Sequence, residues 1–187
     1  MNVNKKYSDL LDYLLEPKTY NYSGDKTICY LTFGMDDIIS VKQNLNQVWV
    51  ELAKNKGFNV TILSIHDLLK SFFSKDEYRI EAGEDAVDSE DDTLEVYQSL
   101  GENLKNQEII EKAILEAQEK IDPKSGVLFI TDLEAIHPFS RFGPIEQKIY
   151  TKIKVPIVVF YPGEISGTAL KFLGFYPEDG NYRSKHF

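Results

Sequence analysis

The stretches Val127-Leu-Phe-Ile-Thr-Asp132 and Val155-Pro-Ile-Val-Val-Phe-Tyr-Pro-Gly163 decide the fold. Each is a short apolar run that ends in a polar turn, and a helix-length segment separates the two. Such runs are typical of parallel strands that are covered by helices on both faces. In sheets of this kind, ligands and partners meet the carboxyl ends of the strands.

Strands and amphipathic helices alternate through the rest of the chain. Apolar periodicity and turn residues predict helices over residues 5–16, 37–55, 66–74, 88–100, 104–121 and 143–154. β-branched and aromatic runs predict strands at Thr27–Phe33, Asn59–Ser64, Val127–Thr131 and Pro156–Tyr161, and a weaker one at Leu170–Phe172. We therefore expect a single three-layer α/β domain over residues 1–187, with a mainly parallel sheet of four or five strands and a Rossmann-like or P-loop-like topology.

Composition narrows the class of protein. The chain has 187 residues, of which 42% are hydrophobic, as expected for one globular domain. Its single cysteine, Cys29, cannot form a disulfide within the chain, which fits a reducing compartment. The first residues lack the apolar core of a signal peptide, and no stretch approaches 18 apolar residues. These features predict a cytoplasmic protein without a membrane segment.

The net charge of −9 is concentrated in one segment. Residues 76–95 hold ten acidic side chains and one basic side chain, Arg79, which together account for the whole excess. A solvated acidic loop is the favoured interpretation, and the alternative is a surface that binds or inhibits a basic protein. Since the sequence has no basic stripe, we expect no direct binding of nucleic acid.

The expected turn after the first strand lacks the residues of a phosphate-binding loop. It reads Phe33-Gly-Met-Asp-Asp37, with one glycine and two acidic residues that would repel phosphate. Neither Gly-x-x-x-x-Gly-Lys-Ser/Thr nor Gly-x-Gly-x-x-Gly occurs in the chain. We therefore expect neither ordinary nucleoside-triphosphate hydrolysis nor a cofactor.

Asp132 ends an apolar strand, as the magnesium-binding acid of an ATPase does. A simple turn-capping role is favoured, because no phosphate loop accompanies it. Glu134, His137 and Arg141 follow in the same loop and form a plausible polar cluster, but without a nucleophile the cluster defines no reaction. The three histidines of the chain lie far apart in sequence, so no metal site is expected.

The end of the sequence is rich in aromatic residues. Phe172, Phe175, Tyr176 and Tyr182 favour packing of this segment onto the domain, and the alternative is an exposed interface anchor. We expect a contact or small-ligand surface built from three pieces: the loop after the third long strand, the loop after the fourth, and the tail. Its members would be Asp132, Glu134, His137, Arg141, Gly163, Glu164, Tyr182 and Arg183.

Four stretches at this end resemble the BrxB-type small proteins of BREX bacteriophage-exclusion systems. They are residues 127–141, 155–163, 170–179 and the closing Asn181-Tyr-Arg183, in the family's order. The resemblance implies a non-catalytic accessory or scaffold protein of a bacterial phage-defence complex. It also implies association with PglZ, a larger alkaline-phosphatase-like partner. The alternative is a nucleotide-binding sensor or enzyme with an atypical site at the carboxyl ends of the strands, for which Asp132 is the strongest support.

Overall fold

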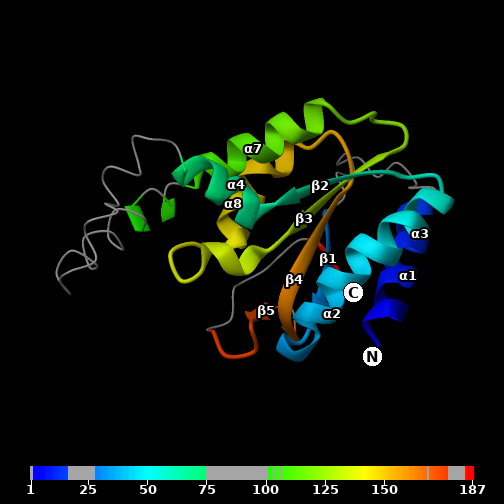
Figure 1. Ribbon diagram of the computed structural model, residues 1–187, viewed down its shortest axis with the longest axis horizontal. Helices are drawn as coiled ribbons and strands as arrows, with labels where there is room; N and C mark the ends of the chain where they lie inside the picture. The colour runs from blue at the N-terminus through cyan, green and yellow to red at the C-terminus, as the bar shows by residue number, and fades with distance from the viewer. Residues whose placement is uncertain are drawn as a thin grey trace.

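The structure is a computed structural model, drawn in Figure 1. It describes residues 2–16, 28–74, 101–102, 104–105, 107–167, 169–176 and 184–187. The expected helix over residues 88–100 and the acidic segment 76–95 lie outside these residues.

A mainly parallel sheet forms the centre of the fold (Figure 1). Its strands are β1 (Ile28–Phe33), β2 (Asn59–Ser64), β3 (Gly126–Thr131), β4 (Ile157–Ser166), β5 (Ala169–Phe172) and β6 (Lys185–His186). The order is β2-β3-β4-β1-β6, and β5 pairs with β4 in the antiparallel sense. The expected strands are confirmed, and β6 adds a sixth that the sequence pattern did not predict.

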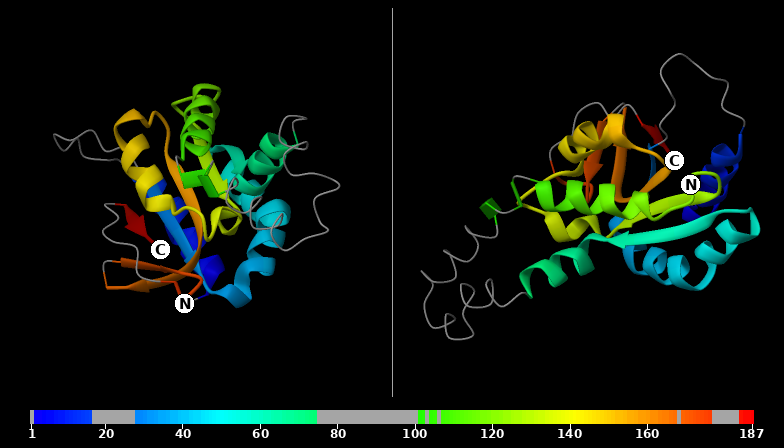
Figure 2. Two further views of the ribbon diagram at one scale, coloured as in Figure 1. Left: turned by 90° about the vertical axis from the view of Figure 1, so that its left-hand side faces the viewer. Right: turned by 90° about the horizontal axis from the view of Figure 1, so that it is seen from above.

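Helices cover both faces of this sheet, as Figure 2 shows. They are α1 (Val3–Leu15), α2 (Ile38–Asn44), α3 (Val50–Asn55), α4 (Ile65–Phe73), α7 (Glu108–Glu119) and α8 (Phe142–Ile149). One apolar cluster joins α4, α7 and α8 to the sheet, and a second joins α1, α2 and α3 to its other face. Both β1 and β3 are buried throughout, because side chains that alternate along a strand enter one cluster and then the other. The predicted three-layer α/β class is confirmed.

The long helix expected over residues 37–55 is interrupted by a π-helical turn, Leu45–Trp49. The wider turn keeps both Leu45 and Trp49 in the core, where Trp49 stacks on Tyr7 with 4.6 Å between ring centroids. The Tyr7 hydroxyl donates a hydrogen bond to the carbonyl oxygen of Trp49 at 2.6 Å. A hydrogen-bond partner from α1 thus satisfies a carbonyl group next to the irregular turn.

The expected helix over residues 104–121 also differs from the structure, where α7 begins at Glu108. Gln107 has a φ of 58°, in the left-handed region, so a regular helix cannot run through it. Leu104 and Lys105 are helical, but they lie before this break.

The fourth long strand is longer than expected, which corrects the placement of Gly163 and Glu164. Both were predicted in a loop after Tyr161, but they lie within β4 and pair with Phe172 and Lys171 of β5. Pairing with β5 provides backbone hydrogen bonds for the part of β4 that extends beyond the parallel sheet. Position 163 needs glycine, because a Cβ there would lie 2.4 Å from the carbonyl oxygen of Lys171.

The last residues close the edge of β1. The Phe187 N–H donates to the carbonyl oxygen of Tyr30 at 2.9 Å, and the Thr32 N–H donates to that of Phe187 at 3.0 Å. Beneath this contact, Glu146 of α8 is only 4% exposed and accepts hydrogen bonds from the hydroxyl groups of Tyr30, at 2.5 Å, and Ser184. We call Glu146, Tyr30 and Ser184 the buried cluster.

Candidate functional site

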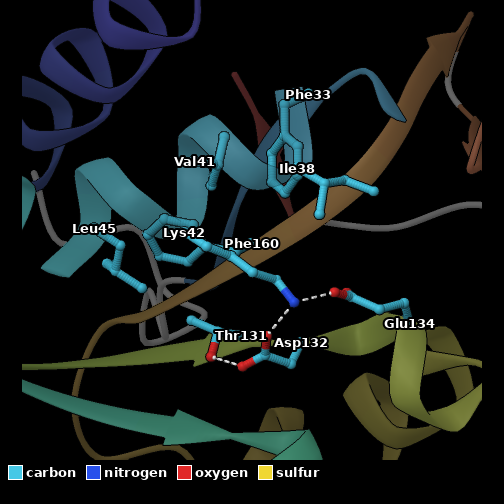
Figure 3. Close-up of a pocket in the computed structure, with 9 residues that line it drawn as sticks. All are labelled: Phe33, Ile38, Val41, Lys42, Leu45, Thr131, Asp132, Glu134 and Phe160. Atoms are coloured by element: carbon cyan, nitrogen blue, oxygen red, sulfur yellow. Dashed lines mark hydrogen bonds and ion pairs between the residues drawn. The ribbon is translucent and has the colours of Figure 1, made fainter. Parts of the chain in front are cut away.

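The sequence analysis placed the candidate residues at the carboxyl edge of the sheet. The connectivity of the strands also indicates this edge as a place where ligands could bind. After β1 the chain crosses to the far strand, β2, and then returns through β3 and β4 until β4 lies beside β1. Ligands of open α/β sheets commonly bind outside the carboxyl ends of strands where the strand order reverses. Phe33, Thr131 and Phe160 mark this region on three neighbouring strands (Figure 3).

An ion-pair cluster occupies this position (Figure 3). The Lys42 ammonium of α2 lies 2.7 Å from a carboxylate oxygen of Asp132 and 2.5 Å from one of Glu134. The Thr131 hydroxyl donates to the second carboxylate oxygen of Asp132 at 2.7 Å. We call Lys42, Asp132 and Glu134 the edge cluster.

The local backbone explains how both acids reach one ammonium group. Asp132 has a φ of 60°, which turns the chain sharply at the end of β3. A 3-10 helical segment, Leu133–Ile136, follows directly and holds Glu134 on the same side. Asp132 thus occupies the N-cap position of this segment, but its side chain makes no capping hydrogen bond, so the favoured turn-capping role holds for its position and not for its carboxylate.

The protonation of the edge cluster follows from these contacts. Burial raises the pKa of Asp132, but hydrogen bonds from Lys42, Ser64 and Thr131 outweigh it and leave that pKa below its ordinary value. Burial lowers the pKa of Lys42, but its bonds to Asp132 and Glu134 leave the net pKa above the ordinary value. The ammonium and the Asp132 carboxylate thus hold one another in the charged state at neutral pH.

The space beneath Lys42 is apolar and small. The cavity has a volume of about 10 Å³, and its floor is formed by Phe33, Ile38, Val41, Leu45 and Phe160. A volume of this size holds about one water molecule. The cavity itself is therefore too small for a nucleotide base.

The residue patterns gave no sign of Lys42. It lies next to Val41 on an amphipathic helix, where an exposed lysine is ordinary, and it is 90 positions away from Asp132 in the chain. Its role depends on the contact between α2 and the turn after β3, and this contact follows from the order of the strands, which the sequence does not show. Within the described residues, no three histidine, cysteine, aspartate or glutamate side chains lie close enough together to hold a metal ion.

His137 belongs to a different group of side chains. Its ring stacks on Phe172 with 3.7 Å between centroids and an angle of 9°, and the ring of Tyr176 lies 4.9 Å away. His137 therefore supports the segment Gly163–Tyr176, which we call the edge hairpin. This segment carries two exposed apolar side chains, Ile165 at 44% and Phe175 at 60%.

The structure brings only some of the predicted surface together. Asp132 and Glu134 join the edge cluster, and His137 joins Gly163 and Glu164 at the edge hairpin. Arg141 is half-buried at the start of α8. Tyr182 and Arg183 lie outside the described residues.

Phe172 and Tyr176 pack against the core, as the sequence predicted, but Phe175 is exposed. Packing of the segment onto the domain is therefore confirmed for Phe172 and Tyr176, and the interface anchor stays a prediction. In the part of the chain that the structure describes, no helix has the length and apolar character needed to span a membrane.

Comparison with known proteins agrees with these observations. The family model described as "BREX protein BrxB" matches residues 61–187. No curated protein and no solved structure matches the chain. The match covers more than half of the sequence and includes β3, the edge hairpin and the closing strand β6. The chain therefore belongs to the BrxB family and is a component of a BREX phage-defence system.

Proposed function

We propose that this BrxB-family protein is a non-catalytic accessory or scaffold component that binds a PglZ-type, alkaline-phosphatase-like partner through the edge hairpin. The observation that carries the proposal is the exposure of Phe175, at 60%, and Ile165, at 44%, on one short segment. Exposed large apolar side chains are typical of protein interfaces, and aromatic side chains supply much of the binding energy there.

Strand pairing and ring stacking support the described part of the hairpin. Residues 163–166 of β4 pair with residues 169–172 of β5, and the His137 ring packs flat against Phe172 behind them. Phe175 contacts the ring of Tyr176, with 4.6 Å between centroids. A pre-ordered surface loses less conformational entropy on binding than a flexible loop does.

The edge cluster supports the non-catalytic part of the proposal. Lys42 directs its charge to Asp132 and Glu134, which are the acids that a nucleotide-dependent enzyme would need for a divalent cation. With both carboxylates paired to this ammonium, a cation at Asp132 would have to compete with Lys42.

Partner capture tests the proposal. The full chain is immobilised, and the binding of its PglZ-type partner from the same BREX system is measured by titration. We expect Phe175→Ala to weaken binding about tenfold or more, since truncation of a central aromatic anchor costs more than about 1.4 kcal/mol. The matched control is Leu52→Ala, because Leu52 is 44% exposed and belongs to α3, which lies apart from β5 (Figure 1). Equal affinity of both variants and wild type would reject the edge hairpin as the interface, and no association by wild type would reject the PglZ-type partner.

A thermal-shift titration addresses the alternative of a nucleotide sensor. ATP, ADP and GTP are added with Mg²⁺ to the full chain, and the unfolding temperature is followed. A ligand present at about 100 times its dissociation constant stabilises a protein by about 2.7 kcal/mol, which is readily measured. We expect no shift with any of these nucleotides. A saturable shift that Asp132→Asn abolishes would favour the sensor.

A further inference from the structure

Strand β2 forms one edge of the sheet. It pairs with β3 along its whole length, from Asn59 opposite Gly126 to Ser64 opposite Thr131, and no other described strand contacts it. The Asn59 N–H donates to the Ser125 carbonyl oxygen at 2.8 Å, on the side of β3. Because the direction of backbone groups alternates along a strand, Val60 and Ile62 direct their N–H and C=O groups away from β3.

Among the described residues, β2 lacks the features that usually prevent association. Edge strands of natural proteins are commonly protected by charged side chains, proline, bulges or short length. The sequence of β2, Asn-Val-Thr-Ile-Leu-Ser, has neither charge nor proline and runs for six residues. Ile62 is 40% exposed on it. The backbone of such an edge fits another extended strand.

We propose that two copies of this chain associate through β2, in an antiparallel arrangement about a two-fold axis at Thr61. Thr61 then lies opposite the partner's Thr61, and Val60 lies opposite the partner's Ile62. Each Val60–Ile62 pair exchanges two backbone hydrogen bonds, and the two sheets become continuous. This interface is distinct from the edge hairpin.

The side chains of β2 suit this register. Val60 and Phe129 belong to the same apolar cluster, and the register pairs Ile62 with Phe129, so Val60 and Ile62 point to the same face of the sheet. In the dimer each exposed Ile62 is covered by the partner's Val60. Pairs of β-branched residues and Thr–Thr pairs are favourable across antiparallel strands.

Charge also favours a second copy in this orientation. Lys54 and Lys56, which form ion pairs with Glu51 and Asp12 of the same chain, precede β2, and Asp67 follows it with a side chain that is 77% exposed. An antiparallel pair brings the start of one strand to the end of the other, so the lysines approach the partner's Asp67. A parallel pair would instead place the lysines of the two copies together.

Sedimentation velocity over a concentration series of the full chain tests the association. We expect wild type to form a reversible dimer. The dimer of Ile62→Lys should have a roughly 100-fold larger dissociation constant, because the two-fold interface contains the substitution twice and each copy costs about tenfold. The control Ile39→Lys adds the same charge on α2, at a side chain that is 72% exposed, and should dimerise like wild type. A monomeric wild type, or an Ile62→Lys variant that dimerises normally, would overturn the proposal.

Cysteine cross-linking tests the register without relying on the folding of a charged variant. Two residues that face each other in a non-hydrogen-bonded antiparallel pair lie about 4.5 Å apart between Cα atoms, within reach of a disulfide. Under mild oxidation, Thr61→Cys should form a covalent dimer efficiently, whereas Val60→Cys should not, because its position faces the partner's Ile62. The native Cys29 is buried, so the background is low. Equal cross-linking of both variants would exclude this register.

Discussion

Two carboxylate-centred clusters in this protein use similar chemistry but differ in burial. In the edge cluster, the side chains of Lys42, Asp132 and Glu134 are 48%, 17% and 31% exposed. In the buried cluster, Glu146 is 4% exposed, and its hydroxyl partner Tyr30 is fully buried.

The difference teaches that burial matters more for stability than the number of charges. Water can solvate the edge cluster when one partner is removed, and ion pairs of this kind contribute about 0–1 kcal/mol. A buried hydroxyl that loses its acceptor cannot turn to water, so each such group costs about 1–3 kcal/mol. We therefore expect the buried cluster to stabilise the fold and the edge cluster chiefly to set local charge.

The largest effect should come from Glu146→Leu, which removes the acceptor of two hydroxyl groups without leaving a large cavity. We expect the free energy of unfolding to fall by about 1.5–3 kcal/mol, chiefly because the buried Tyr30 hydroxyl loses this charged partner, while the half-buried Ser184 hydroxyl adds less. Urea denaturation measures it. A loss below about 1 kcal/mol would remove the contrast between the clusters.

A smaller effect is expected for Tyr30→Phe, which deletes one donor and keeps the aromatic packing. The 2.5 Å hydrogen bond to Glu146 is lost, while the edge-to-face contacts with Phe142 and Tyr161 remain. We expect a loss of about 1–2 kcal/mol in the same assay. A double-mutant cycle with Glu146→Leu should show strong coupling, and additive effects would mean that the two side chains act independently.

The edge cluster should respond more weakly still. Lys42→Met removes the ammonium but retains a flexible apolar stem over Phe33 and Phe160. We expect the free energy of unfolding to change by less than about 1 kcal/mol, because the ion pairs are partly solvated. Binding of the PglZ-type partner should be unchanged. A loss of more than about 2 kcal/mol would show that the edge cluster behaves like a buried one.

The smallest effect concerns pH. The pKa of Asp132 is lower in the folded protein than in the unfolded chain, so its contribution is fully present above the unfolded value of about 3.9. That contribution is lost as the pH falls from there through the lower, folded pKa. We expect the unfolding free energy to drop more for wild type than for Asp132→Asn between about pH 6 and about pH 3. Parallel pH profiles of the two proteins would contradict this assignment.

The strands were predictable because their signal is local. The apolar runs that became β1, β3 and the first half of β4 are buried along their length, and each is visible as a continuous segment in the sequence. The continuation of β4 to Ser166 was not visible, since Pro162 and Gly163 read as a turn. Their extended conformation depends on β5, a partner that no local pattern specifies.

The candidate site could be predicted only in part, for a similar reason. Asp132 and Glu134 were found because they follow a strand end, where functional groups collect. Lys42 was missed because its role depends on a contact between α2 and the turn after β3. The buried cluster was missed as well, since Tyr30 and Glu146 are 116 positions apart and belong to a strand and a helix with ordinary apolar patterns.

The family match begins at position 61, inside β2, whereas the resemblance seen in the sequence covered only the last third. Residues before position 61 also belong to this sheet, because β1 pairs with β4 along its whole length. The preceding segment thus provides a central strand of the sheet that the matched region completes.

This placement of β1 has a consequence for synthesis on the ribosome. β1 precedes the other described strands in the chain, but both its neighbours, β4 and β6, are made more than 120 residues later. The nascent chain must carry an apolar strand with two open edges until β4 and β6 have been translated. Such a chain depends on chaperones or rapid collapse to avoid aggregation, and slowing of late elongation should lower its soluble yield more than slowing of early elongation.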